Sequence, residues 1–500
     1  MFTLTSLYFL LFVAAALFLY YIAPKHFQYY VLIAASSVFI ALYSSPAVFV
    51  FLAADITVIY FGGILQDRLE EGRLRNLAAA VSVILITALL FLLKYYNNVA
   101  EWFPGLNAVA WRCDWPVPIG ISYFTLSAVG YLLDINWQVR KAERNPLKLV
   151  LLVIYFPALV CGPIVRYSEL EKSLFAPHSF DYTKVKFGAE RVLYGLFKKL
   201  VAANRAALLT GTVFSAPRSY SGLVFPFTVL IYALQIYCDF SGCMDIILGV
   251  SEMFQVELPE NFRQPFFSQD LSEFWRRWHI TLGQWAKDYV MYPLLKSSAF
   301  VSLADKCKKR WGKKRGKAVP TYLAMLALWL VIGLWHGGTV THIFACGILL
   351  WIFIVGGMLL QPFFDRLSKF FRVDKARFRY KLFCSLRTLM LMCIMWLFFN
   401  LGIKDGWWAI KNTLLCFNIK TLFDNSPFEL MMWQHYIILA VSLVILLVIG
   451  VMQEQGIRIR QALEKQSTAF QWGVLLPGIL FVVVYGIYGP GYNPADFIYR

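Results

Sequence analysis

Histidines in patterned surroundings are the first candidates for chemistry in this chain. The sequence has six histidines in 500 residues, and we single out His279, His336 and His342. His336 stands in the apolar run LVIGLWHGG, where Gly337 and Gly338 are expected to break or loosen the helix. Counted from Pro320 at about 1.5 Å per helical residue, it lies roughly 24 Å along a helix, deep within a membrane. A neutral imidazole there suits general-base catalysis, although a lone histidine can equally be a structural residue bonded to a neighbour.

The second histidine stands in the segment DLSEFWRRWHITLGQWAKDY. Glu273 and Arg277 are four residues apart, so they can pair on one helix face. The apolar stripe consists of Phe274, Trp278, Leu282 and Trp285. This spacing predicts one amphipathic helix at the cytoplasmic interface, or a re-entrant piece, around His279. By itself the pattern favours a structural role.

Two carboxylates six residues apart interrupt the apolar segment YCDFSGCMDIILG. Asp239 and Asp245 flank Ser241 in it. We expect the two carboxylates to form paired hydrogen bonds that hold a broken helix. We therefore assign them a structural role ahead of a catalytic one.

The elements that must position these residues are membrane helices. Hydrophobic residues make up 59% of the chain and charged residues only 15%, whereas soluble proteins carry about 25% charged residues. This composition excludes a cytosolic enzyme, a secreted protein and a disordered protein, and it predicts an all-α polytopic membrane protein of about eleven transmembrane helices plus re-entrant or interfacial helices. The predicted spans are Leu4–Ala23, Tyr29–Tyr43, Ala47–Leu65, Leu77–Leu93, Leu149–Cys161, Leu223–Tyr237, Tyr322–Trp335, Phe344–Leu360, Leu382–Leu397, Tyr436–Met452 and Val474–Tyr488, with Ile119–Leu133 as a weaker candidate. The spans at Leu149 and Leu223 are short or broken by proline and could be re-entrant.

The chain is strongly basic, with 47 Lys and Arg against 29 Asp and Glu. In a membrane protein such an excess marks cytoplasmic loops rather than nucleic-acid binding. Loop charges then place the N-terminus outside and Gln66–Asn76 inside. The richest basic stretch, Lys306–Lys317, is predicted as a cytoplasmic loop. It either sets topology and binds anionic headgroups or attracts a phosphate-bearing cofactor or acidic carrier protein, with Lys308, Lys309 and Arg310 as candidates.

The nine cysteines predict neither a disulfide framework nor a metal site, because no CxxC spacing occurs. We expect one integral membrane domain over residues 1–500. It comprises N-terminal helices in 1–110, a motif-bearing core in 116–345 and C-terminal helices in 346–500.

Five ordered blocks resemble the membrane-bound O-acyltransferase (MBOAT) family, in its bacterial branch for alginate O-acetylation and D-alanyl transfer to teichoic acids. The blocks are PVPIGISYFTLSAVGYLLD, YFPALVCGPIVRY, QIYCDFSGCMDIILG, NFRQPFFSQDLSEFWRRWHITLGQWAKDY and GLWHG, and the terminal NPADFIYR is similar to the alginate-type C-terminus. The chain departs from the family pattern at Cys243, Met244, Lys287, Val340 and the added His342, and Leu295–Lys296 replaces the usual glycine pair. These departures bear on the substrate rather than on His279 or His336.

The resemblance implies a helix bundle around a central tunnel in a bacterial inner membrane. His336 would be the catalytic histidine and His279 the second characteristic one. The residues expected to line the tunnel or support it are Trp335, Gly337, Trp278, Arg277, Glu273, Asp239, Ser241 and Asp288. The implied donor is acetyl-CoA, with no metal or prosthetic group. The implied partners are an extracytoplasmic hydrolase-like acetyltransferase, a polysaccharide acceptor and membrane lipid.

Three alternatives stay open from the sequence. The first is transfer of D-alanine from a carrier protein to teichoic acid. The second is a transporter or flippase without chemistry, since broken helices and membrane-depth charges also occur there. The third is a lipid-modifying acyltransferase with a long-chain donor.

Overall fold

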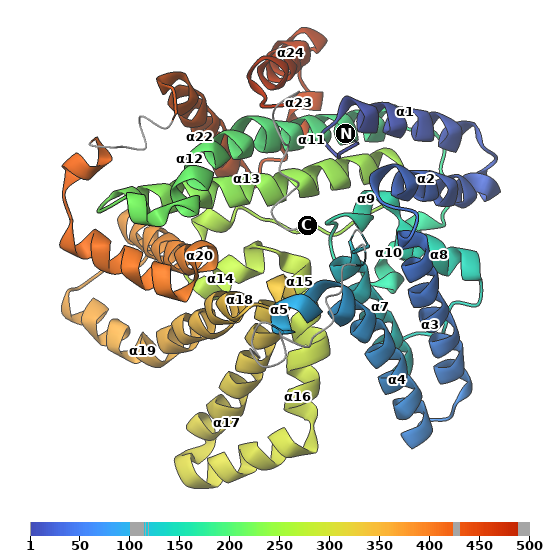
Figure 1. Cartoon of the computed structure of the whole chain (residues 1–500), viewed down its shortest axis with the longest axis horizontal. Coiled ribbons are helices and arrows are strands. Elements are labelled where there is room, and N and C mark those ends of the chain that lie inside the picture. The colour runs from blue at the N-terminus through green and yellow to red at the C-terminus, as the bar shows by residue number, and fades with distance from the viewer. Residues whose placement is uncertain (1, 101–114, 116, 119, 424–430, 489–500) are drawn as a thin grey trace. The chain divides into compact units, whose positions relative to one another are not determined.

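The described part of the chain folds into helices (Figure 1). By their contacts, these helices divide into two compact units. The computed structural model describes residues 2–423, apart from 101–114, 116 and 119, and residues 431–488. The terminal NPADFIYR segment lies outside the described residues. Unit 1 comprises residues 1–204, 237–260 and 455–500, and unit 2 comprises residues 205–236 and 261–454.

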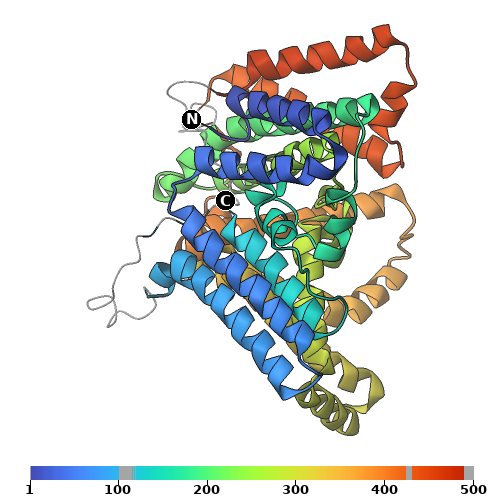
Figure 2. The same ribbon diagram turned by 90° about the vertical axis from the view of Figure 1, so that its right-hand side faces the viewer.

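Unit 1 carries most of the N-terminal helices. In Figure 2, α3, α4 and α7 lie side by side, and they are also packed together by contact. The helices of this unit are α1 (Leu7–Ile22), α2 (Gln28–Tyr43), α3 (Val48–Arg68), α4 (Arg73–Leu90), α5 (Tyr96–Ala100), α7 (Ile121–Asn136), α8 (Pro146–Ile154), α9 (Phe156–Leu159), α10 (Tyr167–Leu174), α11 (Tyr182–Leu196), α23 (Ile459–Glu464) and α24 (Thr468–Tyr485). A π-helical segment, Phe197–Ala203, continues α11, and α13 (Val224–Met253) passes from unit 2 into unit 1.

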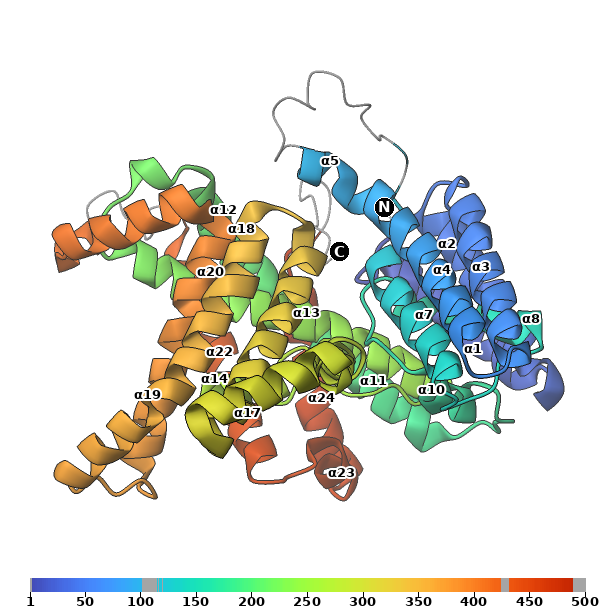
Figure 3. The same cartoon turned by 90° about the horizontal axis from the view of Figure 1, so that it is seen from below.

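Unit 2 holds both histidine motifs. Figure 3 shows α17 beside α18, and the two helices are also in contact. The helices of this unit are α12 (Asn204–Ser215), α14 (Leu271–Arg277), α15 (Ile280–Ala286), α16 (Tyr292–Lys296), α17 (Ser298–Gly337), α18 (Val340–His342), α19 (Leu350–Phe370), α20 (Phe378–Leu415) and α22 (Trp433–Glu454). π-Helical segments follow α15 (Lys287–Met291) and α18 (Ile343–Leu349).

The prediction of a multi-pass, all-α membrane protein is confirmed. Among the described residues, nine helices are long and apolar enough to cross a membrane, and α1 is a shorter apolar helix. The predicted span Leu149–Cys161 is wrong, because the chain there forms only α8 and α9. The break between them falls at Tyr155, just before Pro157, and a proline ring disfavours continuation of the preceding helix.

Two other expectations are corrected by α13 and α17. Helix α13 runs unbroken from Val224 to Met253, so Leu223–Tyr237 is not a short or re-entrant piece and Asp239 does not stand in a broken helix. The basic stretch Lys306–Lys317 is not an open loop: it is helical, with one non-helical residue at Gly312 (φ 76°) where the chain changes direction. A glycine at this point is needed because positive φ strains other residues.

Glycine pairs set the packing of α11 against α13. Gly188 and Gly195 are seven residues apart on α11, and Gly242 and Gly249 have the same spacing on α13. Seven residues are about two turns, so each pair lies on one helix face. A Cβ atom at Gly195 would stand 2.7 Å from the carbonyl oxygen of Gly242, and one at Gly188 would stand 2.4 Å from that of Gly249. The two backbones are therefore in direct contact at these glycines, and side chains can lie only on either side of the crossing.

The cysteines behave largely as small apolar residues. The structure pairs Cys161 with Cys243 in unit 1, and both are fully buried. Among the described residues this is one disulfide, which the spacing of the cysteines does not predict.

Candidate active site

His336 stands at the end of the longest helix of unit 2. Helix α17 ends at Gly337, and Gly338 adopts the left-handed conformation (φ 67°) while its N–H donates to the carbonyl of Leu334 at 2.9 Å. This is the glycine-based helix stop that the sequence predicts. The His336 ring is half-buried, and it meets the edge of the Phe399 ring at a centroid distance of 6.2 Å.

His342 joins the same neighbourhood. Its backbone N–H donates to Thr339 Oγ1, which caps α18, and its Nδ1 lies 2.5 Å from that same oxygen. The His342 ring packs edge-on against Phe399 at 4.8 Å. The sequence marks His342 as a candidate but does not predict which residues surround it. It gives no signal for Phe399, because Phe399 comes from α20, far away in the sequence.

His279 lies where the expected single amphipathic helix breaks. Helix α14 ends at Arg277 and α15 begins at Ile280, with Trp278 extended and His279 left-handed at φ 46°. The prediction of one continuous helix is therefore wrong. Left-handed backbone at a residue with a Cβ atom is strained, and surrounding contacts must hold it in place. Here the imidazole is buried, with 2% of its surface exposed, and burial lowers the pKa of His279 to about 3.

Trp335 connects the two predicted catalytic histidines. Its indole ring lies 5.1 Å from the ring of His336 and 5.7 Å from that of His279, edge-on in both cases. Trp335 is itself buried. The structure thus brings together two motifs that are separated by more than fifty residues in the sequence.

The predicted pair Glu273 and Arg277 is confirmed as part of a larger ionic group. Arg277 Nη2 lies 2.8 Å from Glu273 Oε1, and its Nη1 pairs with Glu454 at the end of α22. Gln264 adds a hydrogen bond of 2.5 Å to Gln453 on the same helix. These contacts tie α22 to the segment that carries His279.

Trp278 is packed among aromatic rings rather than aimed at a substrate. It stacks on Phe274 at 5.5 Å and contacts Phe262 and Trp396, with 1% of its surface exposed. Its role here is to hold the break beside His279.

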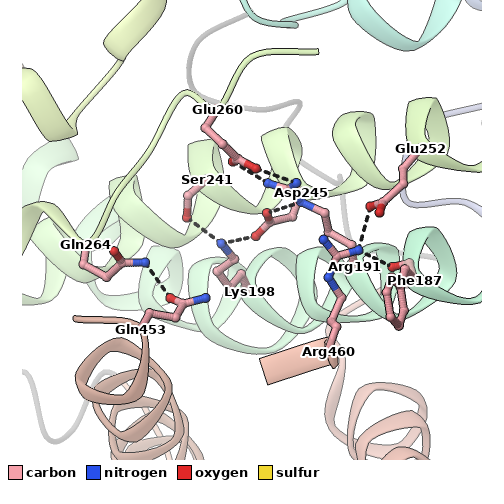
Figure 4. A network of polar contacts seen from close by, with 10 residues as sticks. All are labelled: Phe187, Arg191, Lys198, Ser241, Asp245, Glu252, Glu260, Gln264, Gln453 and Arg460. Carbon is pink, nitrogen blue, oxygen red and sulfur yellow. Dashed lines mark hydrogen bonds and ion pairs between the residues drawn. The ribbon is translucent and has the colours of Figure 1, made fainter. Parts of the chain in front are cut away.

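Asp239 and Ser241 do not belong to the unit that holds the histidines. In unit 1, Lys199 Nζ lies 2.5 Å from Asp239 Oδ1. Figure 4 shows the neighbouring contact, in which Lys198 donates to Ser241 Oγ at 3.0 Å. Lys198 also pairs with Asp245. The sequence interpretation of these acids as architecture fits this arrangement, although their partners are basic residues and not each other.

Arg191 extends this ionic group toward the surface. Its Nε lies 3.0 Å from Asp245 Oδ1, and its Nη2 lies 2.6 Å from Glu260 Oε2 (Figure 4). Buried charges are stable only when they are paired. The group therefore fastens α11 to α13 beside the glycine crossing.

The remaining candidates lie at the edges of unit 2. Asp288 is half-buried in the π-helical segment after α15. Lys308 pairs with Asp305 at 2.8 Å near the surface. Lys309 and Arg310 are exposed on the first part of α17.

Comparison with known proteins gives this geometry a family. Residues 99–304 match the model of the membrane-bound O-acyltransferase family, MBOAT. These residues of the chain thus form a region that matches an MBOAT domain. The matched range includes His279 and ends before His336. The resemblance of the GLWHG block to the family therefore depends on the sequence of that block alone.

The curated relatives that this chain resembles include proteins with three different names. The chain is 34% identical over 227 residues to "Probable alginate O-acetylase AlgI" of Pseudomonas syringae pv. tomato, which covers 45% of the chain and 40% of the relative. It is 28% identical over 339 residues to "Peptidoglycan O-acetyltransferase" of Helicobacter pylori (62% of the chain, 58% of the relative). It is 26% identical over 228 residues to "Teichoic acid D-alanyltransferase" of Bacillus subtilis (44% and 53%). The matched part thus spans about half the length of these relatives.

Removing one acid from the buried ionic group should lower the stability of the fold strongly. Asp245→Asn keeps the shape but strands Lys198 and Arg191 without their shared carboxylate, so we expect the free energy of unfolding to fall by about 3–5 kcal/mol. Asp365→Asn is the matched control, since Asp365 pairs with Lys375 on the exposed surface at 2.7 Å and such pairs contribute little. Unfolding of the purified protein in detergent measures both. Equal stability of the two variants would contradict the structural role of Asp245.

The contact between Gly337 and His342 makes a second prediction. A Cβ atom at Gly337 would stand 2.7 Å from the His342 ring, so Gly337→Ala should destabilise the fold by about 1–3 kcal/mol through overpacking. Adding His342→Ala should restore much of this loss, because the clashing ring is gone. Gly357→Ala is the control, since nothing lies within 4 Å of its added Cβ. An unchanged loss in the double variant would show that the two residues do not touch.

Proposed function

We propose that this protein is a membrane O-acetyltransferase. It takes an acetyl group from acetyl-CoA on the cytoplasmic side and passes it to a hydroxyl group for O-acetylation of an extracytoplasmic polysaccharide. The observation that carries the proposal is the placement of His279 and His336 on one ring, that of Trp335. The names of the alginate and peptidoglycan relatives support the acetyl group and the polymer.

His336 serves as the general base. Its neutral imidazole takes the proton of the acceptor hydroxyl while that oxygen attacks the thioester carbonyl. The tetrahedral intermediate collapses, the carbon–sulfur bond breaks, and the leaving CoA thiolate takes the proton from the imidazolium. The reaction is balanced without an external acid. A half-buried histidine at a glycine-terminated helix end supports this role, because its ring is not sealed inside the core.

The donor side lies at the other end of the same helix. Lys308, Lys309 and Arg310 stand on α17 before its turn at Gly312. From Lys317 to His336, α17 rises about 28 Å at 1.5 Å per residue, close to the thickness of a hydrocarbon core. Cations at one end suit the phosphates of CoA, while the histidine lies a membrane's depth away.

The topology and partners follow from this scheme. The basic segments lie in the cytoplasm of a bacterial inner membrane, and the N-terminus lies outside. A tunnel lets donor and acceptor meet at His336 from opposite sides. An extracytoplasmic hydrolase-like acetyltransferase then hands the acetyl group to the polymer.

A second donor has its own support in the relative named as a teichoic acid D-alanyltransferase. That chemistry uses the same base and a different thioester, a charged alanyl carrier protein. Membranes supplied with labelled acetyl-CoA or with the labelled alanyl carrier distinguish the two donors, and label transferred only from the carrier would overturn the acetyl proposal.

Removal of the base tests the mechanism. We expect His336→Ala to lower acetyl transfer from acetyl-CoA by about 10²–10⁴-fold, the usual contribution of a general base, at an unchanged protein level in the membrane. His26→Ala is the matched control, because His26 is exposed beside α2 and should leave transfer unchanged. Wild-type transfer in His336→Ala would overturn the assignment, and substrate flux without transfer would point to a transporter.

Neutralising the cations on α17 tests donor capture. With Lys308, Lys309 and Arg310 all changed to Gln, the KM for acetyl-CoA should rise while kcat stays the same, because contacts to phosphates bind substrate and transition state equally. The control is the same change at Arg372, Lys375 and Arg377, between α19 and α20. An unchanged KM would leave the α17 cations as a topology signal only.

A further inference from the structure

A short antiparallel pairing holds the break around His279. The chain has an isolated β-bridge between Phe262 and Trp278. On either side of it, the N–H of Arg263 donates to the carbonyl of Arg277 at 2.8 Å, and the N–H of Ile280 donates to the carbonyl of Asn261 at 3.1 Å. Backbone groups buried in the protein must find such partners once the chain leaves a helix. The pairing also fixes Asn261 next to His279.

The backbone N–H of Thr281 fixes the orientation of the Asn261 side-chain amide. The backbone N–H of Thr281 points at Asn261 Oδ1 over 3.1 Å, and Thr281 Oγ1 lies 3.0 Å from the same atom. A backbone N–H can only donate, so the atom facing it is the amide oxygen and not the nitrogen. This removes the usual ambiguity in assigning an asparagine side chain.

The same oxygen faces the imidazole. His279 Nδ1 lies 3.3 Å from Asn261 Oδ1. An amide oxygen can only accept, so Nδ1 must carry the proton. A neutral imidazole has one N–H and one lone pair, and the lone pair is then on Nε2.

We infer that Asn261 is a positioning residue, which holds His279 as the Nδ1–H tautomer so that its Nε2 accepts a hydrogen bond from a substrate. This rests on the proposed function. The group bound is a hydrogen-bond donor, either an amide N–H of the pantetheine arm of CoA or the hydroxyl of the acceptor.

The surroundings of His279 keep the imidazole neutral and still. Asn261, Thr281 and Trp335 are uncharged, and Asn261 and Thr281 are buried with it. Burial lowers the pKa of His279 to about 3, so the ring keeps its Nε2 lone pair throughout the pH range in which such an enzyme works. Arg277, the nearest charged residue on α14, is occupied by Glu273 and Glu454. His336 is the other titratable group on Trp335.

Two substitutions at one position separate positioning from packing. Asn261→Asp keeps an oxygen that accepts from Thr281 and from His279 Nδ1, and its negative charge raises the pKa of His279. Asn261→Leu keeps the size and removes the acceptor. Thr281→Val is the matched control, since it removes one hydrogen bond to Asn261 and leaves the contact with His279.

The first readout needs no turnover. In protein labelled with ¹⁵N-histidine in lipid nanodiscs, with His279→Gln used to assign the signal, wild type and Thr281→Val should show a protonated Nδ1 and an unprotonated Nε2 for His279. Asn261→Leu should show a mixture of tautomers. A protonated Nε2 in wild type, or an unchanged tautomer in Asn261→Leu, overturns the inference.

The second readout is the pH dependence of acetyl transfer. Because the active form of His279 is neutral, Asn261→Asp should move the acid limb of kcat/KM to higher pH and regain activity as the pH rises, while Asn261→Leu stays impaired at every pH. A rise in KM for acetyl-CoA alone assigns the bound donor group to pantetheine, and a rise for the acceptor alone assigns it to the hydroxyl. An acid limb that does not move in Asn261→Asp overturns the inference. Absence of acetyl transfer in wild type would overturn the proposed function and leave the tautomer measurement standing.

Discussion

The interruption of the helix at Trp278 and His279 is the constraint on which the arrangement of unit 2 depends. Backbone that leaves a helix in an apolar interior must have its N–H and C=O groups satisfied elsewhere. Residues 261–263 supply those partners through Arg263 and Asn261, and this brings an asparagine side chain against the imidazole. The aromatic cluster around Trp278 and the ionic group at Arg277 then secure the two ends of the break. A strained left-handed histidine is thereby held in one orientation.

Unit 1 meets a related constraint with charges. The glycine crossing of α11 and α13 lets the two backbones touch, and beyond it Lys198 and Lys199 reach Asp245 and Asp239. Each charge would be costly if left alone in this environment. Membrane-depth ionisable residues are functional candidates by default, yet here they close on one another. The ion pairs that these acids complete between helices explain why the acids are present, without a catalytic role. The histidines of unit 2, in contrast, pack mainly against aromatic rings.

Helix α17 joins the features that the proposed acyl transfer requires. One helix carries exposed cations near its start, a turn at Gly312, and His336 at its glycine-terminated end. The relatives differ in the acyl group and acceptor that their names state. That difference suits a scaffold in which the proposed base and donor entrance are fixed while the residues around them vary. His342 and Val340, which depart from the family pattern beside His336, are placed where such variation would act.

The sequence by itself determined the membrane class, most of the spans, the glycine stop after His336 and the pair of Glu273 with Arg277. These depend on composition and on neighbours within one or two helical turns. Only the tertiary structure decided that His279 sits in a break, that Trp335 joins it to His336, and that Phe399, His342 and Asn261 complete the surroundings. Helical periodicity continues through Trp278 and His279, so no local signal marks the break. It exists because a partner segment supplies the hydrogen bonds that the helix gives up, and such a partner cannot be read from the spacing of one segment.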